Sequence, residues 1–489
     1  MSIFGSSLRR PLSKVRAAVL PLLSLALPLA TSNDAHAAGL YFSDRGVKPL
    51  GRGGAYVAGA NDLGAVWYNP AGLADAGDSF LFDGSWLHYS AEFRRKIQVA
   101  DSGGTLRTYE YPEVKGSTPI LPIPTLGISK VFGAEKQYTV GFSLLAPYTA
   151  ISSYPATVDG RPAASRYSLL SMDGSALVVA GGTFAWKANK WLKLGAGLQA
   201  LVGRFRSTVV FNANPSDRLI GAPEDPTYDS TAQIDASPIV APSGNIGAIV
   251  EPNENWRLGA SFQLPFWVEA PATNRFRLPA AAVFDRATHE GDEVHVSFKL
   301  PAILRVGVEF RKDFEKNKRF KGEVAYVHEF WSMHDAINIT PENIKLLGVT
   351  GFPSPFNVPP LSIPRNFQDS HSFRLGGEYM FPAGQYRLEV RGGGSFETSA
   401  VPRSHVTPLT IDANKVTVAI GGGLYIGDRW RLDAVYAHIF AFNVEVSPTE
   451  AAVPKISPVS GNPTKFEPIN AGSYSARADV IGLGLNYLY

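Results

Sequence analysis

Apolar and polar residues alternate strictly along much of this chain. In the stretch 256–266, apolar side chains occupy every second position, and polar or small side chains lie between them. The same period of two recurs in 294–310, 372–379, 386–391 and 415–426. An amphipathic helix would repeat its apolar positions every three or four residues instead. The pattern therefore predicts β-strands with one apolar face and one polar face.

The connections between these strands alternate between short and long. About fourteen strands can be counted, and every second connection is a short polar turn, as at 134–137, 187–190 and 252–255. The intervening connections, such as 207–239 and 340–370, are long and rich in Pro, Asn and Ser. A one-sided soluble sheet also alternates, but an even number of strands with short turns at one end and long loops at the other is typical of a transmembrane barrel. We therefore predict an all-β fold, an antiparallel transmembrane β-barrel of about 14 strands.

The end of the chain fits such a barrel in an outer membrane. One face of the last predicted strand carries Ile481, Leu483, Leu485, Tyr487 and the terminal Tyr489. A lipid-facing last strand is what barrels present to their insertion machinery, so this machinery and outer-membrane lipid are expected partners; an ordinary edge strand is the alternative. Beyond residue 37 no apolar run reaches the ~18 residues of a membrane-spanning helix.

Residues 1–37 have the pattern of a cleaved signal peptide. Four basic residues precede the apolar stretch 17–30, and Ala35-His36-Ala37 matches an A-x-A cleavage site, so the mature chain is expected to start at Ala38. The segment holds four Lys or Arg and one Asp, so its removal brings the 46 basic and 43 acidic residues into balance. A neutral mature chain gives no reason to expect a nucleic-acid partner. The chain has no cysteine, so it does not use disulfides.

Residues 38–78 separate the signal from the first alternating strand and are expected to form a hatch inside the barrel. The part 51–74 is too rich in Gly and Ala for a core helix and too apolar for a linker. Its glycines allow turns and close contact with a wall, and the proline fixes a bend next to an asparagine that can bind wall backbone. The candidate gate residues are Gly51, Gly53, Gly54, Asn69, Pro70 and Ala71. A purely structural plug is the alternative.

The barrel itself, residues 79–489, holds weaker candidates. Gly141 and Pro147 fall in the expected strand 138–154, and because proline removes a ladder donor, a kink or gap in the wall is expected there. The alternative is a proline at the exposed end of the strand. Apolar residues of the connections 207–239 and 271–291 can line a capture groove or pack within the loops; the candidates are Phe211, Leu219 and Phe284.

Three inward-facing arginines are candidates for attracting a carboxylate head group. These are Arg305, Arg374 and Arg391. The alternative is a ladder of charges across the lumen with Glu309, Glu378 and Glu389. No catalytic motif occurs, and His328 with His334, six positions apart, are a weak metal signal. We therefore expect no catalytic residue, metal or cofactor.

Several segments resemble the long-chain fatty-acid transporter family, the FadL/TodX-like hydrophobic-compound channels of Gram-negative outer membranes. The N-terminal block is the most specific part, and the resemblance extends over essentially the whole mature chain. The segments that carry it are Ala38-Gly39-Leu40, Gly51 to Tyr56, Asn69 to Leu73, Val140 to Ser143, Ala146-Pro147-Tyr148, Leu300 to Gly307, Trp331-Ser332, Asp369, Phe373 to Gly376 and Arg391 to Gly393. The resemblance implies a monomeric barrel with an N-terminal hatch, outer loops that collect a hydrophobic ligand, and a lateral opening in the wall.

The function expected from this resemblance is passive outer-membrane transport of hydrophobic molecules, by capture at outer loops, hatch-gated passage and lateral exit. Long-chain fatty acids are the first candidate ligands and aromatic hydrocarbons the second. A general polar porin is a rival, but the segment 38–78 argues against an open lumen. A barrel enzyme such as a phospholipase would need a Ser/His pair near the outer rim, and the sequence places none there.

Overall fold

The computed structural model describes residues 44–118, 122–148, 152–214, 224–456 and 468–489. The predicted signal peptide, the start at Ala38 and the candidate Leu219 lie outside these residues. The described strands form one closed antiparallel barrel of 14 strands, which confirms the predicted fold class. The first and last strands close it, with Ser79 opposite Leu488. Among the described residues, no helix is long and apolar enough to cross a membrane.

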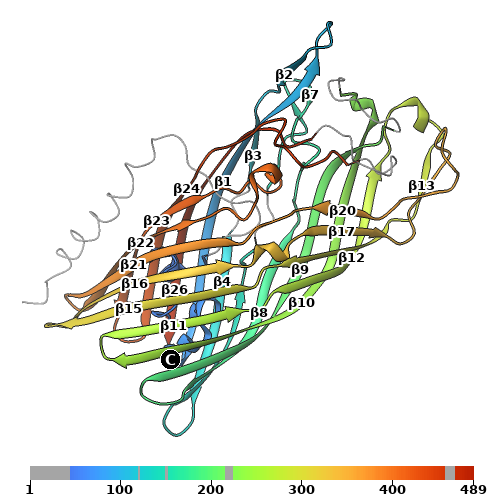
Figure 1. Ribbon diagram of the computed structural model, residues 1–489. Coiled ribbons are helices and arrows are strands. Elements are labelled where there is room, and N and C mark those ends of the chain that lie inside the picture. The colour runs from blue at the N-terminus through green and yellow to red at the C-terminus, as the bar shows by residue number, and fades with distance from the viewer. Residues whose placement is uncertain (1–43, 119–121, 149–151, 215–223, 457–467) are drawn as a thin grey trace, which may run out of the picture. The chain divides into compact units, whose positions relative to one another are not determined.

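Four of the fourteen strands are divided in two, and for three of them both halves carry labels in Figure 1. The wall consists of β1 (Ser79–Ala100), β4 (Pro122–Phe132), β5 (Tyr138–Leu145), β8 (Ala176–Lys187), β9 (Leu192–Asn212), β10 (Asp229–Asn253), β11 (Trp256–Gln263) with β12 (Phe266–Arg277), β14 (Glu293–Leu300) with β15 (Ile303–Phe314), β16 (Lys318–Glu329) with β17 (Ala336–Pro341), β20 (Leu361–Pro364) with β21 (Ser370–Ala383), β22 (Tyr386–Glu397), β23 (Lys415–Ile426), β24 (Trp430–Ala441) and β26 (Gly472–Leu488).

Short elements extend the wall or cap its loop end. The short strands are β2 (Leu106–Glu110), β3 (Val114–Ser117), β6 (Thr157–Val158), β7 (Arg161–Pro162), β13 (Thr288–Glu290), β18 (Lys345–Leu347), β19 (Phe356–Asn357) and β25 (Val444–Val446). Single 3-10 turns are η2 (Pro226–Tyr228), η3 (Ala282–Phe284), η4 (Trp331–Met333) and η5 (Arg403–His405). The long connections gather at the end of the barrel where β2, β7 and β13 lie, and the short turns lie at the other end, as at the tip of β15 (Figure 1).

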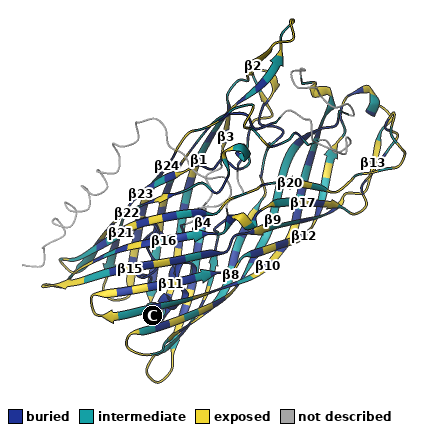
Figure 2. Cartoon of the chain, in the orientation of Figure 1, coloured by how far each residue is buried: buried dark blue, intermediate teal, exposed yellow. Residues whose placement is uncertain are grey.

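The outer face of the wall is apolar, as a lipid-facing surface must be. On β21, Phe373 is 59 % and Leu375 is 64 % exposed, whereas Arg374 between them is buried. The alternation of buried and exposed residues along the strands is visible in Figure 2. The period of two in the sequence therefore comes from a wall with lipid on one side and a filled lumen on the other.

Several expected strand limits differ from the structure, two of them at candidate residues. The strand expected over 138–154 ends at Leu145, because Pro147 has no backbone N–H to continue the ladder. The connection expected over 207–239 is shorter, since β9 runs to Asn212 and β10 starts at Asp229. Val210 and Phe211 are consecutive and both buried. The apolar and polar residues therefore no longer alternate here, and alternation was the signal from which the strands were predicted.

The hatch occupies the lumen and is made of short helical turns. These are α2 (Val47–Gly51), α3 (Ala65–Tyr68) and η1 (Pro70–Asp75). Tyr56, Trp67 and Tyr68 are at most 1 % exposed, so even the large side chains of this segment are enclosed by the wall. Helices of four or five residues are not stable alone. The hatch therefore takes its shape from the wall around it.

Candidate functional site

One arginine connects the hatch to three acidic side chains of the wall. Arg52 Nη2 lies 2.8 Å from Glu309 Oε2 and 3.1 Å from Glu323 Oε2, and its Nη1 lies 3.4 Å from Glu378 Oε2. All four side chains are buried. A buried charge is stable only when it is paired, so the hatch and these strands depend on one another.

Glu323 also binds the backbone of the hatch. Its two carboxylate oxygens accept hydrogen bonds from the N–H groups of residues 57, 58 and 59, at 2.6, 2.9 and 2.9 Å. Three consecutive N–H groups therefore point at one carboxylate, and the hatch backbone comes close to the wall at Gly59. An ideal Cβ at Gly59 would lie 2.0 Å from Glu309 Oε2, so no larger residue fits there without a shift.

Asn69 joins two parts of the hatch to the wall. Its Nδ2 donates to the carbonyl of Val57 at 3.0 Å and to the carbonyl of Ala248 in β10 at 3.1 Å. Its Oδ1 accepts from the N–H of Ala71 at 3.1 Å and caps η1, which starts at Pro70. The sequence-predicted group Asn69, Pro70 and Ala71 therefore lies against the wall as one unit; its role as a gate is a separate question.

The three predicted hatch glycines lie where the backbone comes close to the wall. Gly53 has a φ of +61°, and an ideal Cβ there would lie 2.3 Å from the backbone N of Gly394. Gly54 also has a positive φ, of +74°, and an added Cβ there would clash with Nη1 of Arg374. An ideal Cβ at Gly51 would lie 3.4 Å from the Cα of Gly421. Larger residues at positions 53 and 54 would strain the backbone, and at position 53 they would also push the hatch away from β22.

The three candidate lumen arginines contact the hatch or other lumen acids. Arg374 bonds Asp44 of the hatch, and Arg391 bonds Glu389 and, at 2.8 Å, Asp433. The guanidinium of Arg305 lies 5.3 Å from the ring centre of Trp67. Arg374 and Arg391 therefore pair with acids inside the barrel, and none of the three arginines is among the described residues that line the pocket below.

The wall is interrupted after β5. Gly141 itself pairs regularly with Ser129 and Thr183, and it allows close approach of Leu73, whose side chain would lie 3.1 Å from an added Cβ. Between Leu145 and β6 the described residues form only isolated bridges, at Tyr148 and at Ser153. The carbonyl of Pro147 accepts from Arg45 Nη2 at 2.5 Å, so the interruption is in contact with the hatch.

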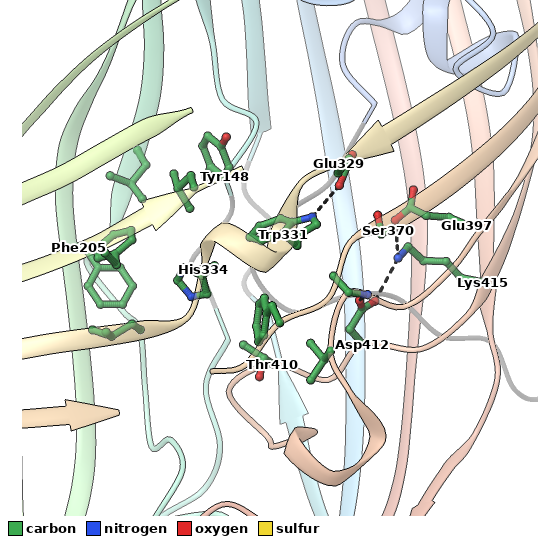
Figure 3. A pocket seen from close by; sticks show the side chains of 17 residues that line it. Tyr148, Phe205, Glu329, Trp331, His334, Ser370, Glu397, Thr410, Asp412 and Lys415 are labelled. Carbon is green, nitrogen blue, oxygen red and sulfur yellow. Dashed lines mark hydrogen bonds and ion pairs between the residues drawn. The ribbon is translucent and has the colours of Figure 1, made fainter. Parts of the chain in front are cut away.

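A pocket lies next to this interruption, and Tyr148 forms part of its wall (Figure 3). Its empty space is about 850 Å³, including the part open to solvent. One side is apolar, with the aromatic rings of Phe205, Phe298, Trp331 and Phe367. The other side carries Glu329, Glu397, Asp412 and Lys415, and Lys415 Nζ lies 2.5 Å from Glu397 and 3.1 Å from Asp412. The pocket can hold an apolar body and one polar group.

The candidate loop residues lie elsewhere. Phe211 belongs to β9, and Phe284 belongs to η3, where it packs in an outer cluster with Leu346 and Val349. Neither is among the described residues that line the pocket. His328 contacts His371 across the wall, at 3.2 Å between the Nδ1 atoms, while His334 lines the pocket. Within the described ranges, no group of three or more His, Asp or Glu is arranged to hold a metal ion.

Sequence reasoning missed Arg52, Glu323 and most of the pocket. Arg52 is the one charged residue within 51–60, and a lone charge inside a Gly-rich apolar segment is a signal for a buried ion pair. The pocket residues come from many strands and loops, and no local pattern marks them. Of the lining residues, Tyr148, Leu300 and Trp331 appeared earlier in segments that carried the family resemblance, and His334 appeared as part of a weak metal signal.

Comparison with known proteins places the chain by both sequence and fold. The family model of the outer membrane protein transport protein (OMPP1/FadL/TodX) matches residues 28–489. The crystal structure of a Pseudomonas aeruginosa FadL homologue has a TM-score of 0.68 and 14 % identity, and the match covers 92 % of this chain and 99 % of that one. The P. putida toluene transporter TodX has a TM-score of 0.59 and 15 % identity, with 91 % and 99 % covered.

A third solved structure agrees with these two. The Ralstonia pickettii toluene transporter TbuX has a TM-score of 0.55 and 17 % identity, with 91 % of this chain and 99 % of that one covered. No curated protein matches the chain in sequence. At these identities the solved structures show the fold, and the family model covers nearly the full length. The chain belongs to the OMPP1/FadL/TodX family of outer-membrane proteins, which transport hydrophobic compounds and are not a family of enzymes.

Proposed function

We propose that this protein carries long-chain fatty acids passively across the outer membrane. The ligand enters the pocket from the outer loops, the hatch gates its passage, and it leaves sideways through the interruption after β5. The observation that carries the proposal is the continuity of these parts: Tyr148 lines the pocket, the adjacent Pro147 marks the interruption, and its carbonyl binds Arg45 of the hatch. Movement of the hatch would therefore change the wall beside the ligand.

The large free energy gained when an apolar ligand is enclosed argues that part of the protein must move to release it. Enclosing an 18-carbon chain stabilises it by on the order of 10 kcal/mol, at ~0.8 kcal/mol per CH₂. A ligand held so tightly leaves slowly unless its site opens. The hatch packs apolar side chains against the wall, and it is also held by polar contacts, to Glu323 and through Asn69, which can be exchanged for others when it moves.

Lateral exit suits the same ligand. An open strand edge is not tolerated in lipid unless its backbone groups are satisfied, and the carbonyl at Pro147 has Arg45 as a donor. An apolar molecule that leaves here passes from protein to lipid without crossing water. The interruption of the wall at Pro147 and the side chain that satisfies its backbone, Arg45, therefore lie at the same place.

Aromatic hydrocarbons are the second candidate class. The pocket wall offers five aromatic side chains, including Tyr148, and rings of this kind pack well against a flat ligand through edge-to-face contacts. The two solved toluene transporters bear toluene in their names, which makes toluene the natural second probe.

Uptake and conductance together test this function. Cells that express the protein should take up labelled oleate faster than cells with the empty vector, and the purified protein should show no large steady conductance in planar bilayers. Pro147→Val supplies the missing backbone donor and should slow uptake while leaving a heat-resistant barrel. A large conductance for small ions, or oleate and toluene uptake equal to the empty vector, would contradict the proposal.

The export signal is part of the same proposal. We expect the mature protein in the outer membrane to start at Ala38, after removal of residues 1–37. The mass of the intact purified protein measures this directly, and a mass that includes the first 37 residues would show that the segment is retained.

A further inference from the structure

His334 presents an unpaired hydrogen-bond acceptor at the pocket. Its Nδ1 lies 2.6 Å from the carbonyl oxygen of Lys299, and because a carbonyl can only accept, Nδ1 carries the proton. The ring follows η4, between the two halves of one wall strand, and is 2 % exposed. Burial disfavours the charged form of an imidazole, and the nearby cation Arg365 disfavours it further. The neutral ring therefore has a lone pair on Nε2, and this atom has no hydrogen-bond partner among the described residues.

Glu329 presents a second acceptor. Its Oε2 accepts from Nε1 of Trp331 at 2.7 Å, and its Oε1 has no hydrogen-bond partner within the described part of the chain. In Figure 3 the Trp331 side chain lies between Glu329 and His334, so the two acceptors flank one aromatic ring. A buried acceptor that stays unpaired is costly, and a ligand that donates a hydrogen bond would remove this cost.

The charges around the pocket disfavour an anion. Glu329, Glu397 and Asp412 line it together with a single cation, Lys415, whose ammonium group already bonds Glu397 and Asp412. Two further cations lie outside the lining. Arg374 is 4.0 Å from Glu397 but is bonded to Asp44. Arg365 is buried near His334, and its Nε and Nη2 have no hydrogen-bond partner among the described residues, but it is not among those that line the pocket. Among the lining residues, an ionised carboxylate would meet three acids and two bare lone pairs.

We propose that the pocket recognises an apolar molecule whose polar end is an uncharged hydroxyl group, and that it discriminates against an ionised carboxylate. The hydroxyl donates its hydrogen to Nε2 of His334, while the hydrocarbon part packs against Trp331 and Phe298. This inference rests on the proposed transport of hydrophobic molecules through this pocket. It adds long-chain alcohols and other hydroxylated hydrocarbons to the proposed ligands, and a fatty acid fits in its protonated form, whose hydroxyl can make the same hydrogen bond.

Three ligands with the same 18-carbon chain test the inference on the unmodified protein. Binding of labelled oleyl alcohol, methyl oleate and oleate is measured at pH 8.5 on protein in detergent solution. Oleyl alcohol donates a hydrogen bond, the ester does not, and oleate is an anion. We expect the alcohol to bind about tenfold more tightly than the ester, the size of one buried hydrogen bond, and oleate to bind most weakly.

Any other order of the three affinities contradicts one of the claims. If oleate binds most tightly, or if the ester equals the alcohol, the hydroxyl preference is wrong while transport of hydrophobic molecules stands. If none of the three binds above the detergent background, the pocket is not a ligand site, and both proposals fail.

Glu329→Gln provides a matched variant. The amide oxygen can keep the bond from Trp331, and the amide N–H₂ then replaces the bare Oε1 and removes a negative charge. We expect oleate to gain about tenfold in affinity relative to oleyl alcohol. Glu254→Gln, in the exposed turn between β10 and β11, changes the same charge far from the pocket and should leave the ranking as it is. An unchanged ranking in folded, heat-resistant Glu329→Gln protein would contradict the assigned contact.

Discussion

At the scale of single residues, Arg52 is the main electrostatic link between hatch and barrel. It is fully buried, and its three acidic partners lie on β15, β16 and β21. Removing one partner from a buried ion-pair network costs more than the network contributes, because the remaining charges are left unpaired. Glu309, Glu323 and Glu378 would each lose their hatch cation.

We therefore expect Arg52→Leu to destabilise the folded barrel by about 3–5 kcal/mol. The measurement is reversible urea unfolding in lipid vesicles, followed by tryptophan fluorescence. Arg403→Leu is the control, since the Arg403 side chain is 59 % exposed and its loss should change stability by less than about 1 kcal/mol. Equal stability of the two variants would show that the three acids find other partners.

Some residues could be predicted from the sequence and others could not, for a physical reason. Asn69 was predicted as a wall contact, because its side-chain amide can hydrogen-bond backbone groups, and it does bond the wall at Ala248. The partners of Arg52 lie 257, 271 and 326 positions away along the chain. Alternation shows which face a charge occupies but not which opposite charge it meets across the lumen.

At the scale of elements, the hatch is seated by glycines of the wall. An ideal Cβ at Gly376 in β21 would lie 1.9 Å from the carbonyl oxygen of Arg52, and one at Gly393 in β22 would lie 2.3 Å from the same backbone. Both contacts are with backbone, which cannot turn aside as a side chain can. A single methyl group at these positions therefore has to move the hatch.

Gly376→Ala should loosen the hatch without breaking the wall. We expect faster hydrogen exchange in the described hatch, residues 44–78, and a lower midpoint of thermal unfolding. Gly392→Ala is a matched control, since an added Cβ at Gly392 meets nothing within 4 Å. If the two variants exchange at the same rate, the close approach of β21 does not fix the hatch.

At the scale of the whole molecule, the sequence predicts the barrel better than the pocket. Period two, turn length and the aromatic last strand all come from the lipid-facing wall, which repeats around the molecule. The pocket is formed where strands are interrupted, as between β16 and β17, and its lining residues are far apart in sequence. An interruption breaks the alternation of apolar and polar residues. Sequence patterns therefore predict the pocket region less well than the rest of the barrel.

The central claim is that the hatch must move for a ligand to pass, and a reversible tether tests it most directly. An ideal Cβ at Gly307 in β15 lies 3.1 Å from the Cβ of Val57, close to the roughly 3.5–4.5 Å of a disulfide. The chain has no cysteine, so Val57→Cys with Gly307→Cys gives one defined bond between hatch and wall. Each single variant serves as a control. We predict that the oxidised double variant loses most oleate uptake and that a reductant restores it; equal uptake in the oxidised and reduced forms would contradict the gate.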